Sequence, residues 1–442
     1  MKNERMKKDF RSTNNRARGN SVRRDKEQTA PQKKEKPVRK AILSFEDIKQ
    51  QLAAWAENER IPGKFQAWFT ADADSEHADW RIIKTVRGGH ETLSIEAPAH
   101  GMEHPELVTC LFEQLKKDHL RVFSKALRQI WLRATGDGRY AMLVQVNLRG
   151  RNSAHGYKTL IDFVQRNCPK IISCHHVQCL PDLLFDPIGT TPMKVEVKRA
   201  FGNDFMPIGE TGICMHVLDW SPRIRDAWMG LPKRIEDAIH PNAEDSFFEF
   251  YSGSSYVSAS LANLFKKVVS MDCREYAMMS SRQNARNVIN DNMRFIRGHV
   301  EQDFFGKFFS KEENEGRWTF YFNLPGDEPL AQGVAQMAAQ SRPERILLQT
   351  GDLEVASHTI KQFRNYGYML RKNIPLYLEP GSGKFEVLFL FVPDRAGILG
   401  QNPLQKQRSR NVQRPQERIS RKKTSEIPHF SQGSPTFKQR KG

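Results

Sequence analysis

The stretch that decides the fold is Phe247-Phe-Glu-Phe-Tyr-Ser-Gly253-Ser-Ser-Tyr-Val-Ser-Ala-Ser-Leu-Ala-Asn-Leu-Phe-Lys-Lys-Val-Val-Ser-Met-Asp272. It starts with a mostly aromatic run and continues with Ser and Gly residues around Gly253. A helical pattern follows and leads into the apolar run Val268–Met271. This order predicts a buried strand, a tight turn, a helix and a second strand. A strand–helix–strand unit of this kind builds a parallel sheet.

The same alternation continues towards the C-terminal end of the chain. Further strands are expected at Met293–Ile296, Thr319–Phe322 and Arg345–Gln349, and the expected helices are Ser258–Lys267, Arg274–Asn290, Leu330–Gln340 and Leu353–Tyr366. The runs Tyr368–Tyr377 and Phe385–Pro393 are joined by a turn rather than a helix, which predicts an antiparallel hairpin. The fold class predicted for residues 213–395 is therefore α/β, a doubly wound sheet that ends in an antiparallel hairpin.

The preceding residues have a different pattern. Residues 105–212 predict an α+β domain with a long helix, Glu106–Trp131, a helix at Tyr157–Arg166, and strands at 141–147 and 170–173. Residues 41–104 predict a small separate region, in which Ser44 caps a helix from Phe45 and the strand-like stretch Trp80–Ile95 turns at Gly88-Gly89.

The charge lies at the two ends of the chain. The 442 residues carry 69 Lys plus Arg and 51 Asp plus Glu, a formal net charge of +18. Residues 1–40 have a net charge of +10, residues 401–442 a net charge of +9, and residues 41–400 a net charge of −1. We expect both ends, 1–40 and 396–442, to be disordered basic tails, useful either for solubility or for binding a polyanion such as RNA.

The composition also restricts the class of protein. No apolar run is long enough to span a membrane, the basic N-terminus lacks the apolar segment of a secretory signal, and only six cysteines are present. These features predict a cytoplasmic protein in a reducing compartment, with no membrane partner and no disulfide framework.

A ligand in such a sheet lies at the turn after the first strand. Gly253 suits that tight turn, Ser255 stands where a second glycine would allow close approach, and Asp272 ends the second strand where it could bind ribose hydroxyls. An alternative is that Asp272 simply caps the helix that begins near Arg274.

Several motifs together resemble the S-adenosylmethionine-dependent RNA uracil-C5 methyltransferases, whose Rossmann-like class I methyltransferase domain has this strand plan. The motifs are Gly253 with Leu261-Ala262, Gln283-Asn284-Ala285-Arg286, Gly367-Tyr368, Pro380, Glu386, and the stretch 345–391, which matches the family pattern without a gap. In residues 105–212, Cys110, Gln114-Leu-Lys and Cys179 resemble the family's RNA-binding domain. The family's N-terminal oligonucleotide-binding barrel is not evident in residues 41–104.

The resemblance implies roles for individual residues. It places Glu386 as the base that removes the C5 proton, and it places Gly351 where the family has its nucleophilic Cys. The implied cofactor contacts are Glu249, Gly253, Ser255, Asp272 and Asn323. Asn323 stands where the family has an Asp, and Asp327 could substitute for that Asp. His299 stands where the family has another acid. Asp352, next to Gly351, is better explained as a helix N-cap.

The cysteines allow a metal site on spacing alone. Cys168, Cys174, His175, His176 and Cys179 are close in sequence, but side chains alternate faces along a strand and no second paired motif accompanies them. The family's iron–sulfur cluster needs four cysteines, and only Cys110 and Cys179 match its layout in this sequence. We therefore expect neither a metal nor an iron–sulfur cluster.

The favoured hypothesis is an RNA-binding pseudoenzyme on a uracil-C5 methyltransferase scaffold. Its partner would be ribosomal or transfer RNA, bound through the basic tails and residues 105–212. The alternatives are an active S-adenosylmethionine-dependent RNA methyltransferase with divergent chemistry, and an interaction scaffold with basic tails.

Overall fold

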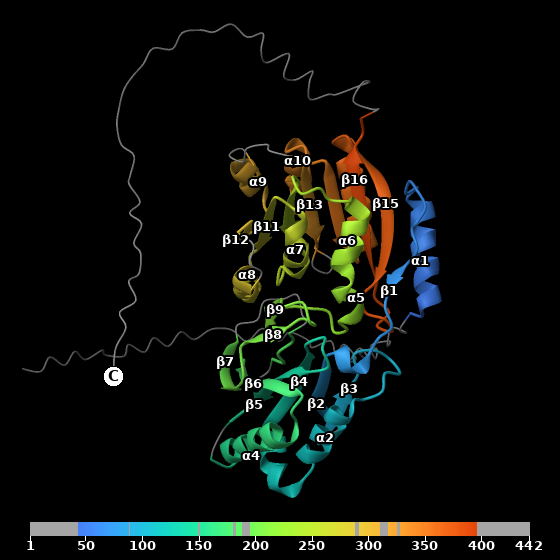
Figure 1. The fold of residues 1–442 in the computed structure, drawn as a ribbon. Coiled ribbons are helices and arrows are strands. Elements are labelled where there is room, and N and C mark those ends of the chain that lie inside the picture. The colour runs from blue at the N-terminus through green and yellow to red at the C-terminus, as the bar shows by residue number, and fades with distance from the viewer. Residues whose placement is uncertain are drawn as a thin grey trace, which may run out of the picture. The chain divides into compact units, whose positions relative to one another are not determined.

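The structure is a computed structural model that describes residues 43–87, 89–148, 151–179, 183–187, 195–287, 291–309, 317–324 and 328–395. The two basic tails and Asp327 lie outside these ranges. The described residues form an eight-stranded sheet and a six-stranded sheet, each covered by helices, together with a small two-stranded sheet (Figure 1).

The eight-stranded sheet confirms the predicted α/β plan. Its strand order is β1-β15-β16-β14-β13-β10-β11-β12. Strands β10 to β14 are parallel, and β16 pairs antiparallel with both β14 and β15. The bounds are β1 Phe69–Thr70, β10 Ser246–Phe250, β11 Lys267–Asp272, β12 Met293–Arg297, β13 Trp318–Asn323, β14 Arg345–Thr350, β15 Tyr368–Tyr377 and β16 Glu386–Pro393.

Helices connect the parallel strands, as expected for a doubly wound sheet. They are α7 Tyr256–Leu261 with the 3-10 turn η3 Ala262–Leu264, α8 Glu275–Asn287, α9 Gln302–Phe309, α10 Val334–Gln340 and α11 Leu353–Asn365. Two further short helices, α5 Asp226–Met229 and α6 Leu231–Ile239, precede β10. The end of the predicted helix Arg274–Asn290 lies outside the described residues.

Side-chain alternation along the strands builds two cores. Phe247, Tyr321 and Leu347 face α6 and α7, whereas Phe248, Phe320 and Leu348 face α9, α10 and α11. Because successive side chains of a strand point to opposite faces, a fully apolar strand is buried on both sides. Strands β10, β11, β13 and β14 are therefore central, which explains why their sequences predicted them well, whereas β12 is the edge strand and is only partly buried.

The six-stranded sheet has the order β3-β2-β4-β5-β6-β7 and is mainly antiparallel, with a parallel β5–β6 pair. Its strands are β2 Trp80–Arg87, β3 His90–Glu96, β4 Leu127–Ala134, β5 Tyr140–Val146, β6 Ile171–Gln178 and β7 Glu196–Phe201. Helices α2 Glu106–Leu115, α3 Arg121–Ala126 and α4 Arg151–Asn167 pack on one face through a shared apolar core. Trp131, Leu143 and Val177 on the other face join the core of the eight-stranded sheet.

The remaining short elements lie in the connecting segments. They are the 3-10 turns η1 Ser75–His77 and η2 Asp118–Leu120, and the strands β8 Phe205–Pro207 and β9 Cys214–His216, which form the two-stranded sheet.

The predicted long helix Glu106–Trp131 is wrong. Helix α2 ends at Leu115, η2 and α3 follow, and the chain becomes strand β4 at Leu127. Trp131 and its neighbours Ile130 and Leu132 are buried between β2 and β5. A short apolar run that is buried on both faces has the same composition in a helix and in a strand, so composition alone could not distinguish them. Here pairing with β2 and β5 makes residues 127–134 a strand.

Residues 41–104 do not form the separate region that the sequence suggested. Helix α1 Phe45–Asn58 packs on the eight-stranded sheet, where Trp55 donates a hydrogen bond to Ser357 Oγ at 2.9 Å, and β1 pairs with β15. The later strands β2 and β3 instead belong to the six-stranded sheet. Locally the prediction was good, because Ser44 caps α1 in a capping box with Asp47.

Candidate cofactor loop and catalytic positions

The turn after β10 has the shape of a ligand loop but is closed. Tyr251, Gly253 and Ser255 all have positive φ, and residues Ser252 to Ser255 are buried. Ser255, with φ of 59°, takes a left-handed conformation that favours glycine. Its Oγ lies 2.6 Å from Ser281 Oγ on α8, which fixes the loop to that helix.

Asp272 already has four donors. Its carboxylate accepts hydrogen bonds from Gly253 N at 2.9 Å and from Arg274 N at 2.8 Å. It also accepts from the Arg274 guanidinium, through Nε at 3.1 Å and Nη2 at 2.9 Å. Asp272 therefore fixes the turn before α8, since its bond to Arg274 N lies one residue ahead of Glu275, where that helix begins. The oxygens that could bind ribose hydroxyls are taken by Arg274.

Arg274 also lies close to Gly253. A Cβ built on Gly253 would be 3.4 Å from Arg274 Nη2, so the guanidinium covers the loop where a ligand would approach. The buried carboxyl of Asp219 is a second acidic neighbour of Arg274, and burial raises the pKa of Asp219 to about 6. As described, this loop does not fit S-adenosylmethionine unless Arg274 moves.

The large side chains next to the loop do not close it. Tyr256 Oη donates to the Met229 carbonyl at 2.8 Å, and its ring packs on Trp228. Phe250 packs in the opposite core, stacked on Phe322 with a centroid distance of 4.8 Å. The sequence missed Arg274 as the closing group, although the spacing Asp272-Cys-Arg274 could have suggested it.

Glu249 lies beneath the loop rather than at a ligand surface. It is 1% exposed, and its Oε2 accepts a hydrogen bond from Ser258 N at 3.1 Å. Burial raises the pKa of Glu249 to about 8, so the carboxyl is largely neutral at pH 7. In the structure Glu249 thus contacts the first turn of α7.

Glu386 lies at the start of β16 in a short hydrogen-bonded relay. Gln349 Nε2 donates to Glu386 Oε2 at 2.5 Å, and Tyr321 Oη donates to Gln349 Oε1 at 2.6 Å. Burial raises the pKa of Glu386 to about 7, and the carboxylate of Glu379 adds to the effect. A carboxyl with such a pKa can take up or release a proton near neutral pH.

Gly351 is adjacent to Glu386, at the end of β14. A Cβ built on Gly351 would lie 2.9 Å from the Phe385 carbonyl oxygen and 3.5 Å from Glu386 Cγ. The first of these distances is shorter than real Cβ contacts, so the backbone of the hairpin occupies the space that a nucleophilic side chain needs. The glycine is required here by close approach of Phe385.

The other expected positions lie at neighbouring strand ends. Asn323 ends β13 beside Gln349 of β14, and it is half-buried. Asp352 caps α11, since its Oδ1 accepts from Glu354 N at 2.8 Å and from Val355 N at 2.9 Å. His299 is exposed after β12. Asp327, the displaced acid, lies outside the described residues.

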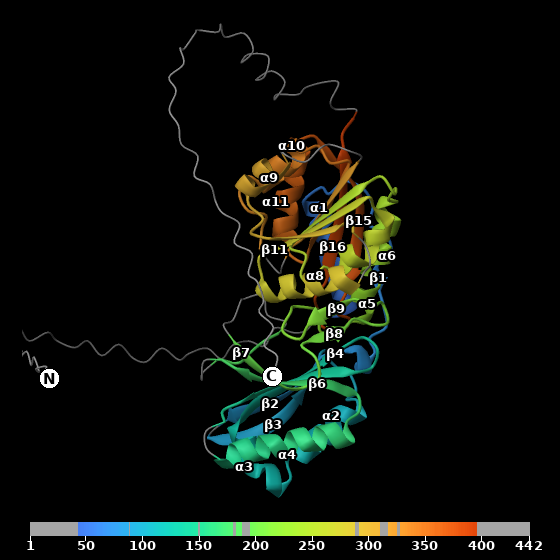
Figure 2. The same cartoon turned by 60° about the vertical axis from the view of Figure 1, so that its left-hand side comes forward.

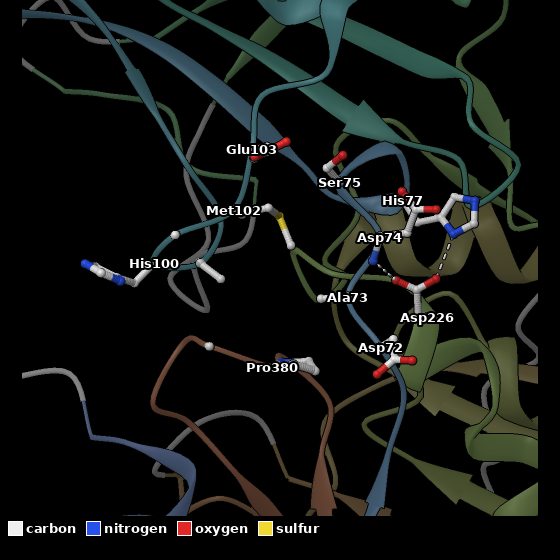
Figure 3. A pocket seen from close by; sticks show the side chains of 13 residues that line it. Asp72, Ala73, Asp74, Ser75, His77, His100, Met102, Glu103, Asp226 and Pro380 are labelled. Carbon is white, nitrogen blue, oxygen red and sulfur yellow. Dashed lines mark hydrogen bonds and ion pairs between the residues drawn. The ribbon is translucent and has the colours of Figure 1, made fainter.

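A cavity of about 870 Å³ lies elsewhere (Figure 3). Asp72, Asp74, Glu103 and Asp226 line it, and His77 Nδ1 lies 2.7 Å from Asp226 Oδ1. None of the candidate cofactor or catalytic residues lines this cavity. Its carboxylates disfavour a phosphate-bearing ligand there.

The described cysteines and histidines do not converge on a metal site. No group of three His, Cys, Asp or Glu side chains within the described ranges could hold a metal ion. Cys110, on α2, is exposed and lies next to the buried Cys168, whereas Cys179 follows β6 and interacts with Gln145. No helix among the described residues is long and apolar enough to cross a membrane.

Comparison with solved structures defines the class of this fold. The crystal structure of the Pyrococcus abyssi tRNA (uracil-54, C5)-methyltransferase in complex with S-adenosyl-L-homocysteine is similar to this chain, with a TM-score of 0.56 and 12% sequence identity. The similarity covers 78% of this chain and 83% of that chain. The tRNA m1G37 methyltransferase of M. jannaschii has a TM-score of 0.39 and 13% identity, over 78% of this chain and 96% of that chain.

The chain has a Rossmann-like class I methyltransferase fold. No family model matches the sequence, and no curated protein matches it closely. The strand order and the similarity to the solved methyltransferase structure confirm the predicted fold class.

Proposed function

We propose that this chain is an RNA-binding protein on a uracil-C5 methyltransferase scaffold that no longer methylates uracil. The observation that carries the proposal is that two positions are already filled: the nucleophile position at Gly351 and the expected cofactor contact at Asp272. The Phe385 carbonyl oxygen fills the space beside Gly351. The Arg274 guanidinium donates two hydrogen bonds to the carboxylate of Asp272. Uracil-C5 methylation needs a thiolate at the first position, and no side chain beside Gly351 supplies one.

The sequence supports RNA as the partner. The two basic tails carry net charges of +10 and +9 around a body that is close to neutral. Two positive segments at opposite ends of one chain favour a polyanion, and one solved structure of similar fold is that of a tRNA (uracil-54, C5)-methyltransferase. Ribosomal or transfer RNA is the proposed target class, and the cytoplasm the proposed location.

The tails give the first prediction. A chain of residues 41–400 should bind a structured RNA on the order of tenfold or more weakly than the full chain at low salt. The slope of log K against log salt should also become flatter, because fewer counterions are released. Filter binding at a series of salt concentrations measures both quantities. Equal affinity and equal slope for the two chains would exclude a role of the tails in binding.

An active methyltransferase with divergent chemistry is the second candidate. The relay from Tyr321 through Gln349 to Glu386 favours it, because the pKa of Glu386 near 7 suits a general base. S-adenosylmethionine could enter only if Arg274 left Asp272. This candidate needs transfer of a methyl group to RNA by the unmodified chain.

Gly351→Cys tests whether chemistry can be restored. We expect no methyl transfer from S-adenosylmethionine to uracil C5 by either the wild type or the variant. We also expect a loss of about 1–3 kcal/mol in the free energy of unfolding, because the new Cβ collides with the Phe385 carbonyl. Radiolabelled methyl incorporation and urea unfolding measure the two effects. Incorporation by the variant alone would show that only the thiolate is missing, and incorporation by the wild type would support the second candidate.

A further inference from the structure

Helices α3 and α4 present basic side chains on their outward faces. On α4, Arg151, His155 and Lys158 are exposed at positions i, i+4 and i+7, so they lie along one side of the helix. On α3, Arg121 and Lys125 are exposed in the same way. Figure 2 shows α4 along the six-stranded sheet with α3 beside it.

A tight helix crossing holds these two faces together. A Cβ built on Gly156 of α4 would be only 2.6 Å from Phe123 Cβ on α3, so the small residue permits close contact. Phe123 and Tyr157 add a ring contact with a centroid distance of 6.2 Å. Both helices cover the same side of the sheet through one core, so their exposed faces point to the same side of the molecule.

The charge on this surface is not neutralised locally. Among the described residues, no ion pair involves Arg121, Lys125 or Lys158. Of the nearby acids, Asp162 lies 4.0 Å from Arg166 on the same helix, and Asp118 stands in η2. Many other exposed basic groups pair with acids, as Lys49 does with Glu46 and Lys361 with Glu59. The excess positive charge is therefore local to α3 and α4.

We infer that this surface, the α3–α4 face of Arg121, Lys125, Arg151, His155 and Lys158, binds the phosphate backbone of structured RNA. The inference rests on the proposed function and adds to it a folded binding surface besides the tails. Lys and Arg side chains on rigid helices neutralise phosphates regardless of base sequence. Arg151 and Lys158 are seven residues apart on α4, about 10 Å along its axis, enough to contact more than one phosphate.

Charge and apolar content favour RNA over a membrane surface. The cavity described above has four carboxylates in its lining, which disfavour phosphate, so the α3–α4 face is the better site for a nucleic acid. Val122 is the one large apolar side chain exposed on α3 and α4 as described, at 51%. A helix that binds in the plane of a membrane needs a whole apolar face for insertion, and here that side of each helix is buried in the core.

The test uses the full chain and a labelled RNA hairpin with a stem of about 20 base pairs, longer than the ~16 that a double-stranded RNA module contacts. The triple variant Arg121→Gln, Lys125→Gln, Lys158→Gln removes three charges from the face. The control variant Lys64→Gln, Arg364→Gln, Arg371→Gln removes three exposed charges elsewhere. Thermal melting by circular dichroism confirms that both variants are folded.

We expect the α3–α4 variant to bind the hairpin roughly fivefold to tenfold more weakly. Its salt slope should be smaller by about 2–3, because three phosphate contacts at roughly 0.7–0.9 each are lost. The control variant should bind like the wild type. Equal losses in both variants, or none in the α3–α4 variant, would overturn the inference and leave the proposed function intact.

A wild type that does not bind the hairpin would overturn the proposed function itself. Vesicles of phosphatidylserine and phosphatidylcholine provide the second probe. Binding to these vesicles that depends on the α3–α4 charges, without binding to RNA, would show that the face recognises a lipid surface and would overturn RNA as its partner.

Discussion

Asp79→Ala is expected to lower the free energy of unfolding by about 3–5 kcal/mol, because it leaves two buried guanidinium groups without their counter-ion. Asp79 is fully buried, and its Oδ1 accepts from Arg225 Nη2 at 2.7 Å and from Ala134 N at 2.8 Å. Its Oδ2 accepts from Arg133 Nε at 3.3 Å. Burial lowers the pKa of Arg133, and Asp79 acts against that effect.

The network also joins the two sheets. Arg133 of β4 donates to the carbonyls of Val217 and Asp219, at 2.7 and 2.6 Å, and to Ser221 Oγ. Residues 217–225 lead into the eight-stranded sheet through α5 and α6, whereas Arg133 lies in β4 of the six-stranded sheet and Asp79 immediately precedes its strand β2. Loss of Asp79 should therefore weaken the contact between the sheets as well as the local packing.

Urea unfolding followed by circular dichroism measures the effect of Asp79→Ala. Glu59→Ala is the control, since its partner Lys361 is exposed, and the loss there should stay below about 1 kcal/mol. If Asp79→Ala does not fold, Asp79→Asn keeps the shape and removes only the charge. A loss below about 1 kcal/mol for either Asp79 variant would contradict the network's role.

The fold could be predicted where local pattern determines structure. Strands β10, β11 and β14 are apolar and rich in β-formers, and the Pro-Gly-Ser-Gly turn before β16 excludes a helix. Assignment of residues 41–104 failed for a different reason. The pairing of β1 with β15 joins residues about three hundred positions apart, and no local pattern records such a contact.

The strand ends at which the candidate residues lie could be predicted from the sequence, but the contacts of their side chains could not. The sequence placed Gly253, Asp272, Gly351 and Glu386 at the correct strand ends, because the topology fixes those ends. It could not show that Arg274 folds back onto Asp272, since a side-chain rotamer depends on the surrounding packing. Nor could it show that the Phe385 carbonyl fills the space beside Gly351.

Glu249→Gln is expected to stabilise the protein by about 3 kcal/mol at pH 7 and by almost nothing near pH 4.5. Burial raises the pKa of Glu249 from 4.5 to about 8, so the folded state holds a proton that the unfolded state has lost. A group whose folded pKa is raised contributes stability at low pH, and that stability is lost as pH rises through about 8. The cost at pH 7 is about 2.5 pH units at ~1.4 kcal/mol each. Gln has the same shape and carries no charge to bury.

Urea unfolding at pH 5, 6, 7 and 8 isolates this carboxyl. Glu386 and Asp219, with pKa values raised to about 7 and about 6, make the wild type less stable as pH rises and remain in the variant. The difference between the two proteins should therefore grow by about 1.4 kcal/mol per pH unit and level off near pH 8. Glu57→Gln, at an exposed position of α1, is the control and should follow the wild type. If the unfolding free energies of the wild type and Glu249→Gln change with pH in parallel, Glu249 is ionised in the folded protein and the loop above it packs over a buried charge.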